Sequence, residues 1–146
     1  MSMEENKAIV RRFLEEYWTK RNVGILEELY EPSYFEKGGR RGIEQAKQGH
    51  QAILDANADV GIDIHEVIAE GNKVVAFFTR HGVLEKQLGP FPPSNEPWKW
   101  VGVGIFYIED GKIVNSWGLS DWMGLYKQSG VTPSLGQLGV RVWNEG

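Results

Sequence analysis

Asp121 is the acidic residue whose sequence neighbours best suit proton-transfer chemistry. It precedes Trp122 and follows Trp117 by four residues, so two indole rings are available to surround its carboxylate. Burial among indoles raises the pKa of a carboxyl group, which suits it to act as a general acid or base on a proton next to a carbonyl group. The alternative is a helix cap, because Ser120 or Asp121 precedes an apolar run. The residues alone favour the cap.

Two histidines are candidates to assist such an acid. His81 ends a segment rich in β-forming residues near an expected pocket rim, so it is a candidate partner base or donor to an enolate oxygen. The alternative is that His81 is a histidine at the end of a strand and has no functional role. His50 lies in a segment with a helical pattern and can point into a pocket. The histidines are not at metal-ligand spacing, and no nucleotide-binding glycine motif occurs, so neither a metal nor a cofactor is expected.

The aromatic content points to an apolar cavity. The chain has six Trp, six Phe and five Tyr among 146 residues. For any one ring, packing in the core is the simpler interpretation, but the set as a whole exceeds what a small core requires. The residues expected around a substrate, together with His50, are Phe13, Tyr17, Phe78, Trp100 and Trp117.

Helical periodicity dominates the first third of the chain. Apolar residues recur at helical spacing over Met3 to Arg21, and a shorter pattern over Ile25 to Tyr30 stops before Pro32. A glycine-rich loop separates these from a third predicted helix, Ile43 to Ala56. Three consecutive helices are therefore expected at the N-terminal end.

The periodicity then changes to that of strands. Ile62 to Ile68 leads through a turn to a strand at Lys73 to His81, and a loop with four prolines covers Leu84 to Pro97. Pro97 to Glu109 and Lys112 to Trp117 flank Asp110-Gly111, a dipeptide typical of the type I′ hairpin turn. Asp121 to Gln128 is expected to form one or two helical turns, and 131–146 has no clear period. The predicted fold is α+β, with helices packed on a curved antiparallel sheet.

The strand from Pro97 to Glu109 is apolar on both faces. Trp98, Trp100 and Phe106 alternate with Val101, Val103, Ile105 and Tyr107. Gly102 and Gly104, which lie within it, favour a bend. Because an apolar outer face also needs cover, we expect a homodimer or higher homo-oligomer that forms through the sheet.

Length and composition limit the classes of protein to which this chain can belong. The length suits one domain over residues 1–146, with a core at 6–130 and a tail at 131–146. The net charge of −4 and the scattered basic pairs indicate no nucleic-acid partner, and no apolar run is long enough for a membrane span. The absence of cysteine and of a signal pattern at the N-terminus fits a cytoplasmic protein.

Several motifs together resemble one family. The hairpin residues 64–75 and 105–117, and the Gly-Pro-rich loop 89–94, are similar to those of SnoaL-like proteins. These are the polyketide cyclase (ester cyclase) group of the nuclear transport factor and ketosteroid isomerase superfamily. The ending W-x₃-D-x₂-G-L-x₂-Q-x-G is matched by Trp117, Asp121, Gly124, Leu125, Gln128 and Gly130. The resemblance covers about Asn6 to Gly130.

The resemblance implies a cone-shaped, cystatin-like α+β fold with a deep apolar pocket. It also implies cofactor-free acid/base chemistry on a polyketide-like ester, with Asp121 as the acid, and this position favours the catalytic role over the cap. The chain departs from the family pattern at Gly82 to Lys86, where the family often has a Gly-Thr-His-x-Gly stretch, and at Gly118, where it often has aspartate.

Two functions therefore follow from the sequence. The first is an enzyme that cyclises, isomerises or hydrolyses an apolar carbonyl compound, with Asp121 and His81 as catalytic residues. The second is a non-catalytic small-molecule binding or accessory protein on the same fold. The retained Asp121 favours the first function, and the missing family histidine favours the second.

Overall fold

Helices come first and strands second in the computed structural model, which describes residues 2–133. The helices are α1 (Met3–Leu14), α2 (Ile25–Leu29) and α3 (Ile43–Ala56), with a π-helical turn at Glu15–Thr19 and a 3₁₀ turn at Pro32–Glu36. The strands are β1 (Asn57–Glu70), β2 (Lys73–Leu84), β3 (Pro97–Glu109) and β4 (Lys112–Ser120). A last helix, α4, covers Trp122–Ser129.

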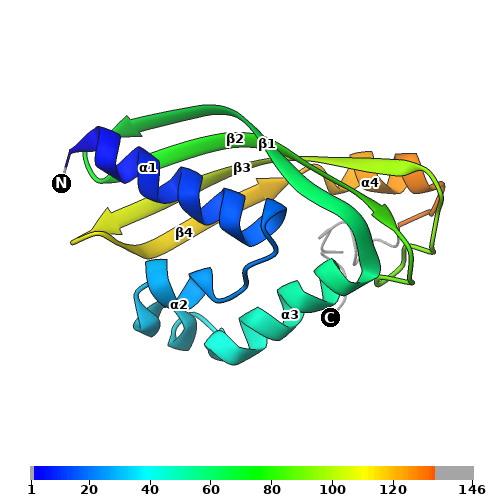
Figure 1. Ribbon diagram of the computed structural model, residues 1–146, viewed down its shortest axis with the longest axis horizontal. Coiled ribbons are helices and arrows are strands. Elements are labelled where there is room, and N and C mark those ends of the chain that lie inside the picture. Colours follow the sequence, from blue (N-terminus) through cyan, green and yellow to red (C-terminus); the bar gives the residue numbers. More distant parts are fainter. Residues whose placement is uncertain (1, 134–146) are drawn as a thin grey trace, which may run out of the picture.

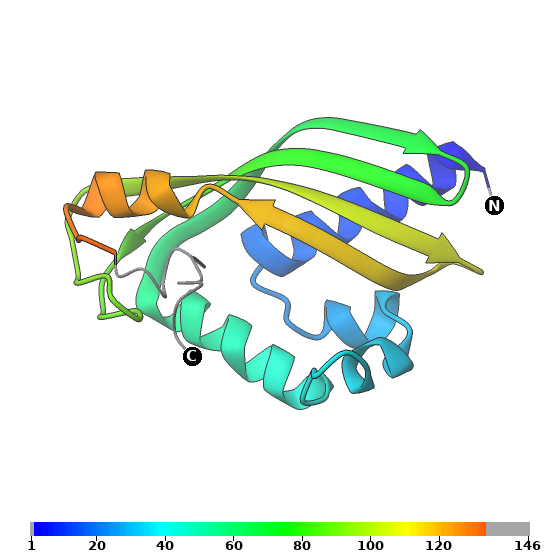
Figure 2. The same ribbon diagram turned by 180° about the vertical axis from the view of Figure 1, so that it is seen from behind.

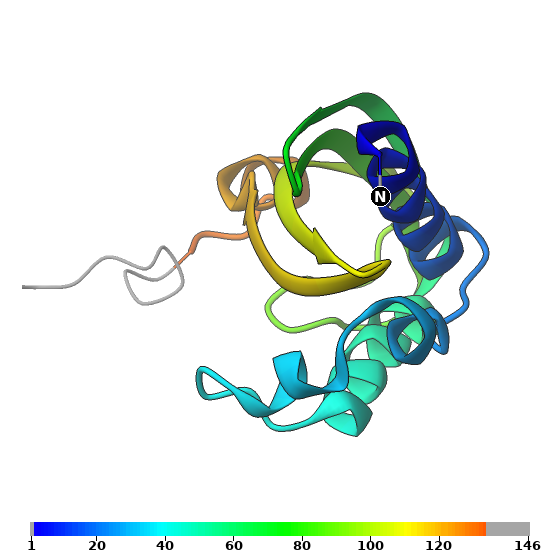
Figure 3. The same cartoon turned by 90° about the vertical axis from the view of Figure 1, so that its left-hand side faces the viewer.

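The four strands form one antiparallel sheet in the order β1-β2-β3-β4 (Figures 1 and 2). Seen end-on, the sheet is strongly curved, and α1, α2 and α3 cover its concave side (Figure 3). Helix α4 follows β4 and lies at the end of the sheet where β3 begins (Figure 1). The expected α+β fold with helices on a curved sheet is confirmed.

The core lies between the concave face and the helices. Even-numbered residues of β2 and β3 point inward, and odd-numbered residues point outward. Helix residues Val10, Ile25 and Leu54 are fully buried against the sheet. A fully buried Val, Leu or Ile side chain stabilises a fold by roughly 1.5–3 kcal/mol relative to an exposed one, so this face anchors the helices.

Gly102 and Gly104 make room for side chains on the concave face. The β2–β3 register is unbroken along their length, so these glycines mark no bulge in this pair. A Cβ atom on Gly102 would lie 2.7 Å from Nη2 of Arg80 and 2.8 Å from the Phe78 ring. A Cβ on Gly104 would lie 2.8 Å from the Phe106 ring. Large inward side chains can therefore lie flat over β3 only because these positions lack a side chain.

The structure alters some predicted element boundaries. The third helix and the Asp110-Gly111 turn, with φ of 48° and 77°, are confirmed. The first helix is α-helical only to Leu14 and ends in the π turn. Strand β1 begins at Asn57 rather than near Ile62, because pairing with β2 holds residues of low strand propensity in place.

The outer face of the sheet is apolar and exposed. Its exposed large side chains are Ile68, Phe77, Val101, Trp117 and Leu119. They come from all four strands, so the apolar surface crosses the whole sheet. A second subunit over this face stays a prediction.

If this face joins two copies of the chain, Trp117→Lys is expected to shift the protein toward single chains, because a charge would be buried in the interface. Light scattering at matched concentrations measures this shift. Met3→Lys, at an exposed position on α1, is the control and should leave the mass unchanged. A wild-type protein that is already a single chain at high concentration would contradict the prediction.

Candidate functional site

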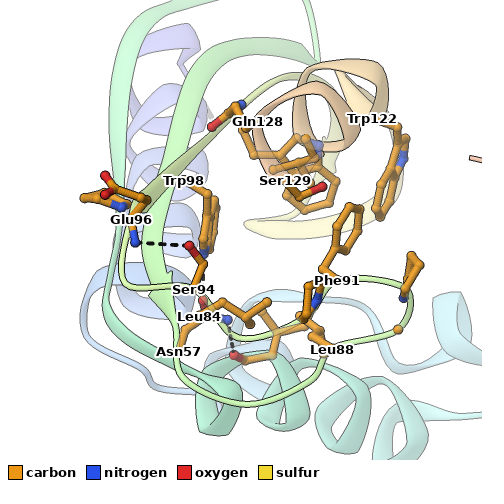
Figure 4. Close-up of a pocket in the computed structure, with 17 residues that line it drawn as sticks. Asn57, Leu84, Leu88, Phe91, Ser94, Glu96, Trp98, Trp122, Gln128 and Ser129 are labelled. Carbon is orange, nitrogen blue, oxygen red and sulfur yellow. Dashed lines mark hydrogen bonds between the residues drawn. The ribbon is translucent and has the colours of Figure 1, made fainter. Parts of the chain in front are cut away.

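A pocket of about 340 Å³ opens at the end of the sheet next to α4. It lies between the end of α3, the paired ends of β2 and β3, the loop of residues 85–96, and α4 (Figure 4). Its aromatic walls are Phe91, Trp98, Trp100 and Trp122. Its aliphatic walls are Ile53, Leu84, Leu88 and Leu125, with Pro90 and Pro92 of the loop and Pro97 at the start of β3.

Polar side chains in the wall are mostly engaged with the protein itself. Nε1 of Trp98 donates to Oδ1 of Asn57 at 2.7 Å, and Nδ2 of Asn57 donates to the Ile53 carbonyl at 2.7 Å. The amide of Gln128 bonds both backbone groups of Lys99, accepting at 2.8 Å and donating at 2.7 Å. These bonds fasten α4 to β3 and leave the interior of the pocket mainly apolar.

The proline-rich loop of residues 85–96 forms one wall of this pocket. The backbone groups of Leu88 and Phe91 exchange two hydrogen bonds of 3.0 Å across Gly89, whose φ is 55°. The Phe91 ring packs 4.9 Å from that of Tyr126 on α4. The loop and α4 therefore support each other, and this contact closes one side of the pocket.

Asp121 is the N-terminal cap of α4. Its Oδ1 accepts a 2.9 Å hydrogen bond from the backbone N–H of Gly124, and the residue is exposed. Its neighbour Trp122 lines the pocket, whereas Asp121 does not. The structure thus gives Asp121 the capping position that the residues alone favoured, and it does not bring this carboxylate into the pocket.

His81 and Trp117 lie on the opposite side of the sheet from the pocket. His81 has an odd number in β2, so its side chain points outward, where Nε2 is 3.9 Å from Oδ2 of Asp63. Trp117 pairs with Ile105 on the outer face and is 55% exposed. Their expected places at the pocket are corrected, because strand alternation turns both side chains away from the helices.

The other predicted residues gather on the inner side. Phe13 and Phe78 belong to the core cluster, and Tyr17 and Trp100 pack against it. Trp100 also lines the pocket. The Phe13 and Tyr17 rings stack at 5.0 Å. These residues, with His50, form a packed aromatic core that adjoins the inner end of the pocket through Trp100.

His50 is buried and fixed by Tyr17. Its ring stacks on the Tyr17 ring at 3.4 Å, and its Nε2 lies 2.7 Å from the Tyr17 carbonyl. The π-helical turn at the end of α1 presents this carbonyl to the histidine. Burial lowers the pKa of His50 to about 4, so the ring is neutral at pH 7. His50 is not one of the residues that line the pocket.

Arg80 is the residue that sequence reasoning missed. It is only 7% exposed, and its guanidinium Cζ lies 3.7 Å from the centre of the Trp100 ring. Nη2 donates to Oγ of Ser120 at 2.6 Å, and burial lowers the Arg80 pKa to about 10. The sequence does contain a signal for it, because Arg80 is a charged residue at an even-numbered position of β2, where the other inward-facing residues are apolar or glycine.

Two further properties concern the described residues only. Between residues 2 and 133, no three His, Asp or Glu side chains gather closely enough to hold a metal ion. Within the same range, no helix has the length and apolar character needed to cross a membrane.

Comparison with known proteins identifies the family. The family model of SnoaL-like polyketide cyclases matches residues 8–129, so this chain belongs to that family. No curated protein matches the chain.

Solved structures share the fold at low sequence identity. TsrD from Streptomyces laurentii is 24% identical, with a TM-score of 0.78 over 90% of this chain and 99% of its own. A candidate polyketide cyclase from Acidithiobacillus ferrooxidans is 22% identical, with a TM-score of 0.74 over 88% and 97%. AclR from Streptomyces galilaeus, a candidate hydroxylase, is 20% identical, with a TM-score of 0.78 over 91% and 89%. The likeness confirms the cone-shaped fold.

Replacing Asp121 is expected to affect stability. Asp121→Ala removes the cap of α4 and should lower the free energy of unfolding by about 0.5–2 kcal/mol. Asp121→Asn retains a capping oxygen and should stay close to the wild type, as urea denaturation will show. Equal losses in both variants would contradict a role limited to the cap.

Buried His50 is expected to make stability depend on pH. Its pKa is lower in the folded chain, about 4, than its ordinary value of 6.5. As the pH falls, the imidazole of His50 is therefore protonated in the unfolded chain before it is protonated in the folded chain. The stabilisation is complete above the ordinary pKa and declines as the pH falls toward the pKa of the folded chain. The loss is on the order of 2–3 kcal/mol.

Urea denaturation at a series of pH values measures this loss. His50→Gln should flatten the dependence between pH 6.5 and about 4, whereas His65→Gln, at an exposed position, should retain it. An unchanged slope in His50→Gln would show that other groups cause the dependence.

Proposed function

We propose that this protein binds an apolar, ring-containing small molecule in the pocket between β3 and α4. The observation that carries the proposal is the aromatic lining of this pocket, formed by Phe91, Trp98, Trp100 and Trp122 around about 340 Å³. Pockets of roughly 300–1,000 Å³ with mainly apolar walls are typical of small-molecule sites. The volume and the flat rings suit a ligand of two or three fused rings.

Membership of the SnoaL-like polyketide cyclase family supports a polyketide-like or other apolar carbonyl compound as the ligand. The placement of side chains favours binding over cofactor-free acid/base turnover. Asp121 caps α4, and His81 lies on the outer face. Glu96 is the acidic residue among the described lining residues; it is exposed, and its carboxylate points away from the enclosed space (Figure 4).

Binding of 2-acetylnaphthalene, a neutral aromatic ketone, tests the proposal. Because Trp98, Trp100 and Trp122 line the pocket, the ketone is expected to change the tryptophan fluorescence of the wild-type protein. Burial of apolar surface should also give a negative heat capacity of binding in calorimetry.

Two substitutions on α4 make a matched pair. Leu125 lines the pocket and Met123 does not, although both lie on the same helix. Leu125→Lys should weaken binding at least tenfold, because a bound ring would have to desolvate the ammonium group. Met123→Lys should bind as the wild type does. Equal affinity of the two variants, or no binding by the wild type, would refute the proposal.

A further inference from the structure

Arg80 lies beside Trp100, the innermost sheet residue that lines the pocket. The lining residues on the concave face are Leu84 of β2 and Trp98 and Trp100 of β3. Trp100 is the innermost of the three, and its register partner on β2 is Arg80. Beyond this pair the sheet is sealed by the core, with Phe78 opposite Gly102. The guanidinium therefore lies against the Trp100 ring, on the core side of the pocket, and Arg80 itself is not one of the lining residues.

This guanidinium is a buried cation without an acidic partner. Among residues 2–133, no Asp or Glu lies within ion-pair distance of it. Leaving a buried charge unpaired generally costs several kcal/mol. The rings of Trp18, Phe78 and Trp100 offset part of that cost, with Cζ 5.3, 5.0 and 3.7 Å from their centres. They supply no hydrogen-bond acceptor in the plane of the guanidinium.

Two hydrogen-bond donors at this place have no acceptor. Both Nε of Arg80 and Nε1 of Trp100 are buried and unpaired within the described chain. They belong to groups in direct contact, because the guanidinium stacks on the indole. Buried donors are almost always paired in folded proteins, so two unpaired donors on stacked side chains require an explanation. An anionic oxygen atom is the acceptor that suits both a guanidinium and an indole N–H.

Ser120 and Gly102 determine where one nitrogen of the Arg80 guanidinium lies. Ser120 accepts from Nη2 at 2.6 Å, and Gly102 leaves the space that Nη2 occupies. The charge at the mouth has the opposite sign, since the exposed Glu96 lies on the rim. An acidic ligand would thus enter with its anionic group first and leave its apolar part among the aromatic walls.

We infer that the pocket takes a ring-containing carboxylate, whose acid group binds Arg80 and the indole N–H of Trp100. This inference rests on the proposed small-molecule function and adds the chemical class of the ligand. Arg80 is then a specificity-determining residue, and Ser120 and Gly102 position it.

The test compares 2-naphthoate with 2-acetylnaphthalene, which has a methyl group in place of the carboxylate oxygen. The wild-type protein should bind 2-naphthoate at least tenfold more tightly at pH 7, measured by calorimetry. Arg80→Gln should lose this preference while still binding 2-acetylnaphthalene. Trp100→Phe, which keeps a ring but lacks the N–H, should reduce the preference.

Each outcome has a distinct meaning. If the wild type binds both compounds equally, or if folded Arg80→Gln retains the preference, the inference is overturned and the proposed function stands. If the wild type binds neither compound, the proposed function itself fails. The wild-type comparison and the Trp100→Phe variant decide the matter even if Arg80→Gln does not fold. A role of Arg80 in packing alone would lower the stability of Arg80→Gln and leave the variant with the same preference as the wild type.

Discussion

The antiparallel register between β2 and β3 determines the side of the sheet on which each candidate residue lies. Side chains alternate across a strand, so a single register fixes all inward and outward positions at once. In this chain the even-numbered residues face the helices, which brings Arg80 opposite Trp100 and sends His81 outward. The same alternation puts Gly102 beneath the Arg80 fork. The core, the inner end of the pocket and the apolar outer face all depend on this pairing.

The helices that cover the sheet decide which polar groups are buried and therefore need a partner. The helices bury the middle of the concave face, and a group that is caught there must be neutral, hydrogen-bonded or supplied with a partner. His50 meets this requirement as a neutral ring bonded to the Tyr17 carbonyl. Arg80 meets it only in part, through Ser120 and three aromatic rings. The contrast separates a core histidine from an arginine that can serve a ligand.

Membership of the family establishes the fold of this chain, whereas its activity depends on the side chains at the site. The three structural neighbours named above share the architecture at 20%, 22% and 24% identity, and they include a candidate cyclase and a candidate hydroxylase. A common scaffold of this kind carries different activities through the side chains at its open end. In this chain that end is built from the proline-rich loop and α4, and the acid of the family motif caps the helix.

The sequence by itself determined the elements whose signals are local. The third helix, the Asp110-Gly111 turn and the alternation along β3 follow from propensity and periodicity. It did not determine which face of β3 is the inner one, because both faces are apolar. Only the tertiary structure decided that Trp117 is outside and Arg80 inside, since helix packing and register select the face. It likewise decided that the Asp121 carboxylate turns back to its own helix, because the first N–H groups of α4 need an acceptor.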